Sequence, residues 1–163
     1  MSLWQDLSDD TNVPVPLPDF DDISMRDELC RTQVFYVDKK LTNAQTLALG
    51  STAVEIVPAP GAGKLLQFCG AYVLNSYKTA ALAVANTGVV TLNYENSSGG
   101  AVTTISQSFL ERAATAYACV APALEVTALV NKALVLLATD TVATGAGYLH
   151  LRVFYRIVRT SEM

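Results

Sequence analysis

The fold of this chain is most clearly indicated by one stretch near its end, Tyr148-Leu149-His150-Leu151-Arg152-Val153-Phe154-Tyr155-Arg156-Ile157-Val158. Side chains in a β-strand point alternately to the two faces of the sheet. One face of this strand would therefore carry Leu149, Leu151, Val153, Tyr155 and Ile157. The opposite face would carry His150, Arg152, Phe154, Arg156 and Val158. This alternation predicts a strand with one face in the core and a second, mixed face outside it.

The rest of the chain after residue 30 also shows strand patterns separated by turn residues. Lys64–Leu74 is apolar on both faces, which predicts a strand covered on both sides. We expect about eight strands: Gln33–Val37, Thr52–Val57, Lys64–Leu74, Val89–Glu95, Ala101–Ser106, Leu124–Val130, Ala133–Thr139 and Tyr148–Val158. The pattern predicts an all-β fold, an antiparallel β-sandwich or barrel, rather than βαβ units.

Two short helices are expected between the strands. Thr42-x-x-Gln45 and Ser108-x-x-Glu111 both have the capping-box pattern that opens a helix. The Ala-rich stretch Ala113–Ala123 is ambiguous, because alanine favours helix and Pro122 would end one.

Composition indicates a globular chain of one domain. The 163 residues are 51% hydrophobic and 16% charged, against about 25% charged residues in typical proteins. The net charge of −4 argues against nucleic-acid binding, which needs a basic surface. The most apolar stretch, Ala113–Val130, is interrupted by Pro122 and Glu125, so no membrane span is expected. The N-terminus lacks the pattern of a secretory signal, and we expect a soluble protein that is intracellular when made.

The first 30 residues differ from the rest. They hold eight acidic residues and one basic residue, whereas residues 31–163 hold seven acidic and ten basic residues. Prolines at alternate positions exclude a helix or a central strand and favour an extended conformation. We therefore expect an extended acidic Pro-rich N-terminal arm over residues 1–30, followed by a β-sandwich domain over 31–163. The arm is either a solvated tail or a segment that orders on a neighbouring subunit. In the second case the expected partner-binding residues are Trp4, Val13, Pro14, Val15, Pro16, Leu17, Pro18 and Phe20.

Motifs for catalysis, cofactors or metals are not found. Gly61-Ala62-Gly63-Lys64 lacks the first Gly and the Ser or Thr of a phosphate-binding loop, and we interpret it as a turn. The single histidine, His150, has no partner motif for a catalytic base. Cys30, Cys69 and Cys119 show no metal-ligand spacing. The sequence therefore predicts a protein that is not an enzyme and has no cofactor.

Three arginines recur near the C-terminus, at positions 152, 156 and 159. Two interpretations stay open for them: a polar outward face, or a row of salt bridges between subunits.

Several segments also resemble a known group of proteins. Ala53-Val54-Glu55-Ile56-Val57-Pro58-Ala59-Pro60-Gly61-Ala62-Gly63-Lys64 resembles a hairpin of small β-sandwich structural proteins of tailed phages, the capsid decoration (cement) or head-fibre type. Asn131–Leu136, Thr144–Leu149 and Val153–Val158 are similar to the C-terminal strand pair of the same proteins.

This resemblance implies a jelly-roll-like β-sandwich and a phage capsid decoration protein. Such a protein binds the outer surface of the major capsid protein shell and stabilises it. The resemblance further implies a homotrimer on the capsid exterior of the virion, made in the host cytoplasm, with arms reaching neighbouring capsomers. The alternative is a head-fibre or tail-associated module that binds a host receptor or glycan through exposed aromatic residues, with Tyr77, Tyr94 and Tyr148 as candidates.

Overall fold

The computed structural model describes residues 33–96, 99–124 and 129–162. Its elements are β1 (Phe35–Lys40), α2 (Asn43–Leu47), η2 (Ala48–Gly50), β2 (Val54–Val57), β3 (Lys64–Val84), β4 (Val90–Tyr94), β5 (Ala101–Ile105), α3 (Gln107–Leu110), β6 (Ala116–Val120), β7 (Leu134–Ala138), β8 (Val142–Arg159) and η3 (Thr160–Glu162). The domain boundary predicted after residue 30 lies outside the described residues.

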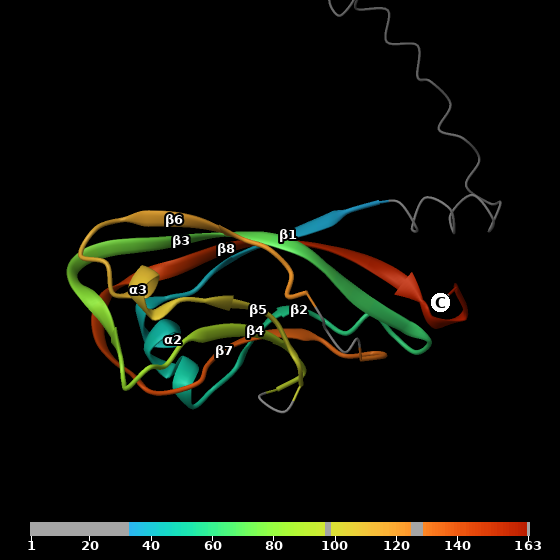
Figure 1. Cartoon of the computed structure of the whole chain (residues 1–163), viewed down its shortest axis with the longest axis horizontal. Coiled ribbons are helices and arrows are strands. Elements are labelled where there is room, and N and C mark those ends of the chain that lie inside the picture. Colours follow the sequence, from blue (N-terminus) through green and yellow to red (C-terminus); the bar gives the residue numbers. More distant parts are fainter. Residues whose placement is uncertain (1–32, 97–98, 125–128, 163) are drawn as a thin grey trace, which may run out of the picture.

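The strands form two antiparallel four-stranded sheets packed face to face (Figure 1). Sheet A has the order β1-β8-β3-β6 and sheet B the order β2-β7-β4-β5. This interleaved order is that of an eight-stranded jelly roll. The expected all-β class, with an antiparallel sandwich of about eight strands, is confirmed.

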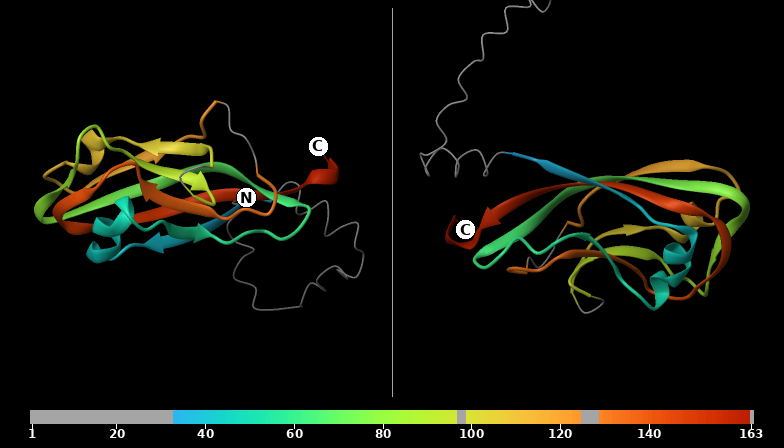
Figure 2. Two further views of the ribbon diagram at one scale, coloured as in Figure 1. Left: turned by 90° about the horizontal axis from the view of Figure 1, so that it is seen from below. Right: turned by 180° about the vertical axis from the view of Figure 1, so that it is seen from behind.

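The two longest strands, β3 and β8, pair with each other and run side by side along the length of the molecule (Figure 2). The predicted alternation of β8 is confirmed, because Leu149, Leu151 and Val153 are buried in the core. Side chains from sheet B meet them there, among them Leu92 and Leu136. A polar bond also links the sheets: the Tyr94 hydroxyl of β4 donates to the Leu66 carbonyl of β3.

Two helical expectations had different outcomes. The capping box at Thr42 is confirmed, with the Thr42 side chain accepting from the Gln45 amide and the Gln45 side chain accepting from the Thr42 amide. The box expected at Ser108 is wrong, because the N-cap of α3 is Ser106, two residues earlier, and it makes no side-chain cap hydrogen bond. The Glu111 carboxylate instead accepts hydrogen bonds from the Val84 amide and the Gln107 side chain.

The Ala-rich stretch also takes a definite form, since residues 116–120 become β6 rather than a helix. Only part of the strand expected over Leu124–Val130 is described, and there Val130 makes one isolated bridge to Leu65.

A buried asparagine fixes α3 to sheet A. The Asn75 side-chain amide on β3 donates to the carbonyls of Phe109 (3.1 Å) and Leu110 (2.8 Å) at the end of the helix. Asn75→Leu keeps the number and branching of the side-chain heavy atoms and removes both bonds. Because an unpaired buried carbonyl costs about 1–3 kcal/mol, we expect the free energy of unfolding to fall by about 2–4 kcal/mol in urea denaturation. Gln67→Leu, at an exposed position of the same strand, should change it by less than about 0.5 kcal/mol, and equal effects would contradict this role of Asn75.

Candidate interaction surface

The outer face of sheet A carries large aromatic side chains that the rest of the described chain leaves uncovered. Tyr36 on β1, Tyr72 on β3 and Tyr117 on β6 are 61%, 52% and 79% exposed. They belong to the outward set of the strand alternation, as does Phe154 on β8. No other described element lies over this side of the sheet (Figures 1 and 2). We call the surface formed by Tyr36, Tyr72, Tyr117 and Phe154 the tyrosine face.

Ring contacts hold three of these four side chains in place. The Phe154 ring lies edge-on to Tyr72 with ring centres 5.5 Å apart. It also packs against Tyr36 at 6.3 Å. The aromatic groups therefore form a continuous row across β1, β8 and β3, which pre-orders them for contact with a partner.

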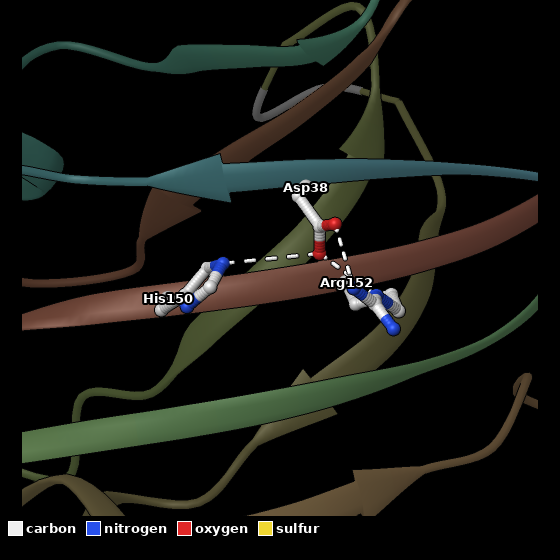
Figure 3. Close-up of polar contacts among 3 residues, drawn as sticks. All are labelled: Asp38, His150 and Arg152. Atoms are coloured by element: carbon white, nitrogen blue, oxygen red, sulfur yellow. Dashed lines mark hydrogen bonds and ion pairs between the residues drawn. The ribbon is translucent and has the colours of Figure 1, made fainter.

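A polar cluster lies next to the row (Figure 3). Arg152 on β8 donates two hydrogen bonds of 2.8 Å to the two carboxylate oxygens of Asp38 on β1. The Nε2 atom of His150 lies 3.8 Å from the Asp38 Oδ1 atom. The Arg152 guanidinium also lies over the Tyr36 ring, 5.0 Å from its centre. This places a fixed ion pair and an imidazole within the aromatic surface.

The ion pair gives the surface a defined pH dependence. The hydrogen bond from Arg152 holds the pKa of Asp38 below its ordinary value of 3.8, an effect that desolvation opposes and the charges of Arg152 and His150 reinforce. The pair therefore contributes stability above about pH 3.8 and loses it as the pH falls through the lower folded-state pKa. We predict a higher urea midpoint for wild type than for Asp38→Asn at pH 5–8, and a gap that closes in more acidic solution. A gap that widened on acidification would contradict this sign.

Two shallow hollows flank Tyr72. One, of about 200 Å³, is lined by Asp38, Tyr72, Tyr117, His150 and Arg152, among others. The second, of about 310 Å³, is lined by Cys69, Tyr72, Cys119 and Phe154, among others. Two larger hollows elsewhere, of about 430 and 730 Å³, have no histidine, cysteine or charged side chain in their linings. A third, of about 480 Å³, is lined by Lys40, Lys78 and Tyr148, among others. Among these hollows of the described part of the chain, those flanking Tyr72 combine exposed aromatic rings with the Asp38–Arg152 ion pair.

The structure places several predicted residues. The eight arm residues from Trp4 to Phe20 lie outside the described residues. His150 points outward beside Asp38. Gly61–Lys64 is a turn into β3, as expected, and its Gly61 amide donates to Asn131 Oδ1 at 2.9 Å.

Cys69 and Cys119 are free thiols, and burial raises the pKa of Cys69. The described residues contain no group of three or more potential metal ligands.

The expectation of exposed loop aromatics is wrong for Tyr94, which is only 2% exposed and lies in the core. Tyr77 and Tyr148 are half-buried. Within the described chain Arg152 forms an ion pair with Asp38.

Sequence reasoning missed Tyr36, Tyr72 and Tyr117 as site residues. The available signal was the strand Lys64–Leu74, whose apolar residues on both faces predicted covering on both sides. The described chain covers one side and leaves Tyr72 on the other exposed. That mismatch between pattern and burial is what marks the face.

Comparison with known proteins finds similarity among solved structures. No family model and no curated protein matches the chain. Among solved structures, the chain is similar to a chain of the Cyanophage Pam1 capsid asymmetric unit. The TM-score is 0.43, the sequence identity is 17%, and the match covers 76% of this chain and 83% of that chain. None of the described helices is long and apolar enough to cross a membrane.

Proposed function

We propose that this protein is a structural component of a phage particle. In this proposal it is a capsid decoration (cement) protein that binds the outer surface of the major capsid protein shell and stabilises it. It acts as a homotrimer on the capsid exterior, and its N-terminal arms over residues 1–30 reach neighbouring capsomers. The protein is made in the host cytoplasm, uses no cofactor and is not an enzyme. The observation that carries the proposal is the uncovered tyrosine face.

The composition of this face supports a role in protein contact. Tyr, Phe and Arg are enriched in the centres of protein interfaces, where large rigid rings bury much surface at little entropic cost. Here Tyr72 and Phe154 form the centre, and the Asp38–Arg152 ion pair supplies directional hydrogen bonds beside them. A continuous exposed aromatic patch on a small domain is more often an interaction site than a surface that contacts only solvent.

The architecture and the arm support an assembly role in two further ways. A jelly roll is a recurrent fold of viral capsid domains, although a fold alone does not fix a function. Several arms on one trimer would also gain avidity, because after one arm binds the others act at a high effective concentration. Each arm contact can then be weak while the trimer stays bound.

Removing the arm tests this proposal. We expect a chain lacking residues 1–30 to bind purified expanded capsids at least tenfold more weakly than the full chain. Binding is measured by co-sedimentation at several protein concentrations, and circular dichroism checks that the shortened chain is folded. Unchanged affinity would refute the arm role.

The tyrosine face also supports a second candidate, a head-fibre or tail-associated module that binds a host glycan. Sugar rings stack on tyrosine rings, and their hydroxyl groups hydrogen-bond to side chains such as Asp38 and Arg152. A glycan array distinguishes the two functions. The decoration role predicts no binding, whereas binding that Tyr72→Ser abolishes would favour the module.

A further inference from the structure

We infer that residues 9–22 of one copy bind the tyrosine face of a neighbouring copy. This inference deepens the proposed function, because it names the surface that receives an arm. It is tested on the free protein without capsids, so that its failure and the failure of the decoration role are separate results.

The proline-rich segment of the arm suits the aromatic hollows of the tyrosine face. Residues 13–18 read Val-Pro-Val-Pro-Leu-Pro. In the polyproline II conformation that these prolines favour, residues three apart lie on one edge, about 9 Å from each other. Aromatic-lined grooves bind such segments by receiving side chains of one edge in adjacent pockets. The tyrosine face offers two adjacent hollows, one on each side of Tyr72.

The charges of the arm and of the outer side of sheet A are opposite in sign. The proline run is flanked by Asp9 and Asp10 before it and by Asp19, Asp21 and Asp22 after it. The outer side of sheet A has basic residues at both ends of the aromatic row. Lys40 lies at one end, with its Nζ atom 4.1 Å from the Tyr148 ring centre. At the other end the outward position of β8 is Arg156, opposite Gln67.

The spacing of the two charge patterns agrees. Tyr148 and Arg156 lie eight positions apart on β8, which is about 26 Å at the rise of a strand. Asp10 and Asp19 lie nine positions apart, which is about 28 Å at the rise of polyproline II. An acid–proline–acid segment therefore matches a base–aromatic–base surface in order and in length. Opposite charges at both ends would also fix the register of the bound segment.

The choice of a neighbouring copy as the source rests on the proposed homotrimer, in which several arms and several tyrosine faces belong to one particle. The described chain begins at Gln33 and Val34, which are both exposed, and continues into β1, an edge strand of sheet A. The first residues of β1, Phe35 and Tyr36, pair with Tyr155 and Phe154 of β8, while β3 and β8 extend farther in the same direction (Figure 1). The described chain thus begins at the margin of its own tyrosine face, next to Tyr36.

Trp4 provides a direct probe, because it is the only tryptophan in the chain and lies in the arm. We expect its fluorescence anisotropy to rise with the concentration of the full-length protein. The face variant Tyr72→Ser/Tyr117→Ser and the arm variant Pro14→Ala/Pro16→Ala/Pro18→Ala should each shift this rise to at least tenfold higher concentration. Asp19→Asn/Asp21→Asn/Asp22→Asn should weaken association and reduce its dependence on salt. Leu124→Ser, at an exposed apolar position outside the face, is the matched control and should behave like wild type.

Mixing the face variant with the arm variant is the decisive step. The first retains an intact arm and the second an intact face, so the mixture should regain a concentration-dependent anisotropy that neither variant shows alone. Equal anisotropy in wild type and both variants would overturn the inference. An anisotropy that is high in wild type but independent of concentration, with no recovery on mixing, would overturn the neighbouring copy as the source.

Discussion

Replacing Tyr72 and Tyr117 together by serine is expected to weaken binding to expanded capsids by about a hundredfold. Central aromatic residues of an interface commonly contribute more than 1 kcal/mol each, and about 1.4 kcal/mol corresponds to tenfold in affinity. Both side chains are exposed in the free chain, so their truncation leaves no cavity in the core. The folded state should therefore be retained while the contact is lost. The measurement is co-sedimentation with capsids over a range of protein concentrations.

Two controls separate contact from folding. The variant should keep the thermal midpoint of wild type within a few degrees, and Leu124→Ser should keep both midpoint and affinity. If the double variant binds capsids as wild type does, contacts at the tyrosine face, whether with the shell or with the arm of a neighbouring copy, do not hold this protein on the particle.

The largest expected effect on stability comes from Gly147→Val. Gly147 lies on β8 opposite Tyr77 with a φ of 155°, a conformation that side chains rarely adopt. An added Cβ would lie 2.1 Å from the Ser76 carbonyl oxygen, which is backbone on the paired strand and cannot rotate away. Strain and clash together should lower the free energy of unfolding by more than about 3 kcal/mol in urea denaturation.

Gly63→Val provides the comparison for this prediction. Gly63 also has a positive φ, 68°, but an added Cβ there meets nothing within 4 Å. We expect a loss of about 1–2 kcal/mol from backbone strain alone. Equal losses at the two positions would show that the close approach of β3 and β8 at Gly147 is not a stability determinant.

The outlines of the strands could be predicted from sequence where alternation is clean. Residues 148–158 alternate because one side of the strand lies in the core. Residues 90–94 also form a strand, but both sides of it are buried, including Thr91 and Asn93. The order of strands in the sheets could not be predicted, because alternation specifies faces and not neighbours. β3 continues to Val84, ten residues past the expected end, and its pairing with β8 shows register shifts after Tyr77 that interrupt the pattern.

Local rules failed where tertiary contacts compete with them. β6 forms from an Ala-rich segment because it pairs with β3 and places Ala116, Ala118 and Val120 against the core, which outweighs the helix preference of alanine. The Ser108 box failed because Glu111 binds the Val84 amide of a distant strand.

The interaction surface could be predicted only in part. The outward position of His150, Arg152 and Phe154 follows from the alternation of one strand. Their grouping with Tyr36, Tyr72 and Tyr117 depends on the pairing of β1, β3 and β6 around them, which brings together residues from four separate parts of the chain. The ion pair of Arg152 with Asp38 joins positions 114 residues apart for the same reason.

The most direct test of the proposed function is the amount of this chain in purified particles of its phage, relative to the major capsid protein. Quantitative mass spectrometry with labelled reference peptides from both proteins gives this ratio. A decoration protein should be present at an amount comparable to the capsid protein. A small fraction of that amount would indicate a fibre or tail component instead, and its absence from the particles would contradict a structural role in the virion.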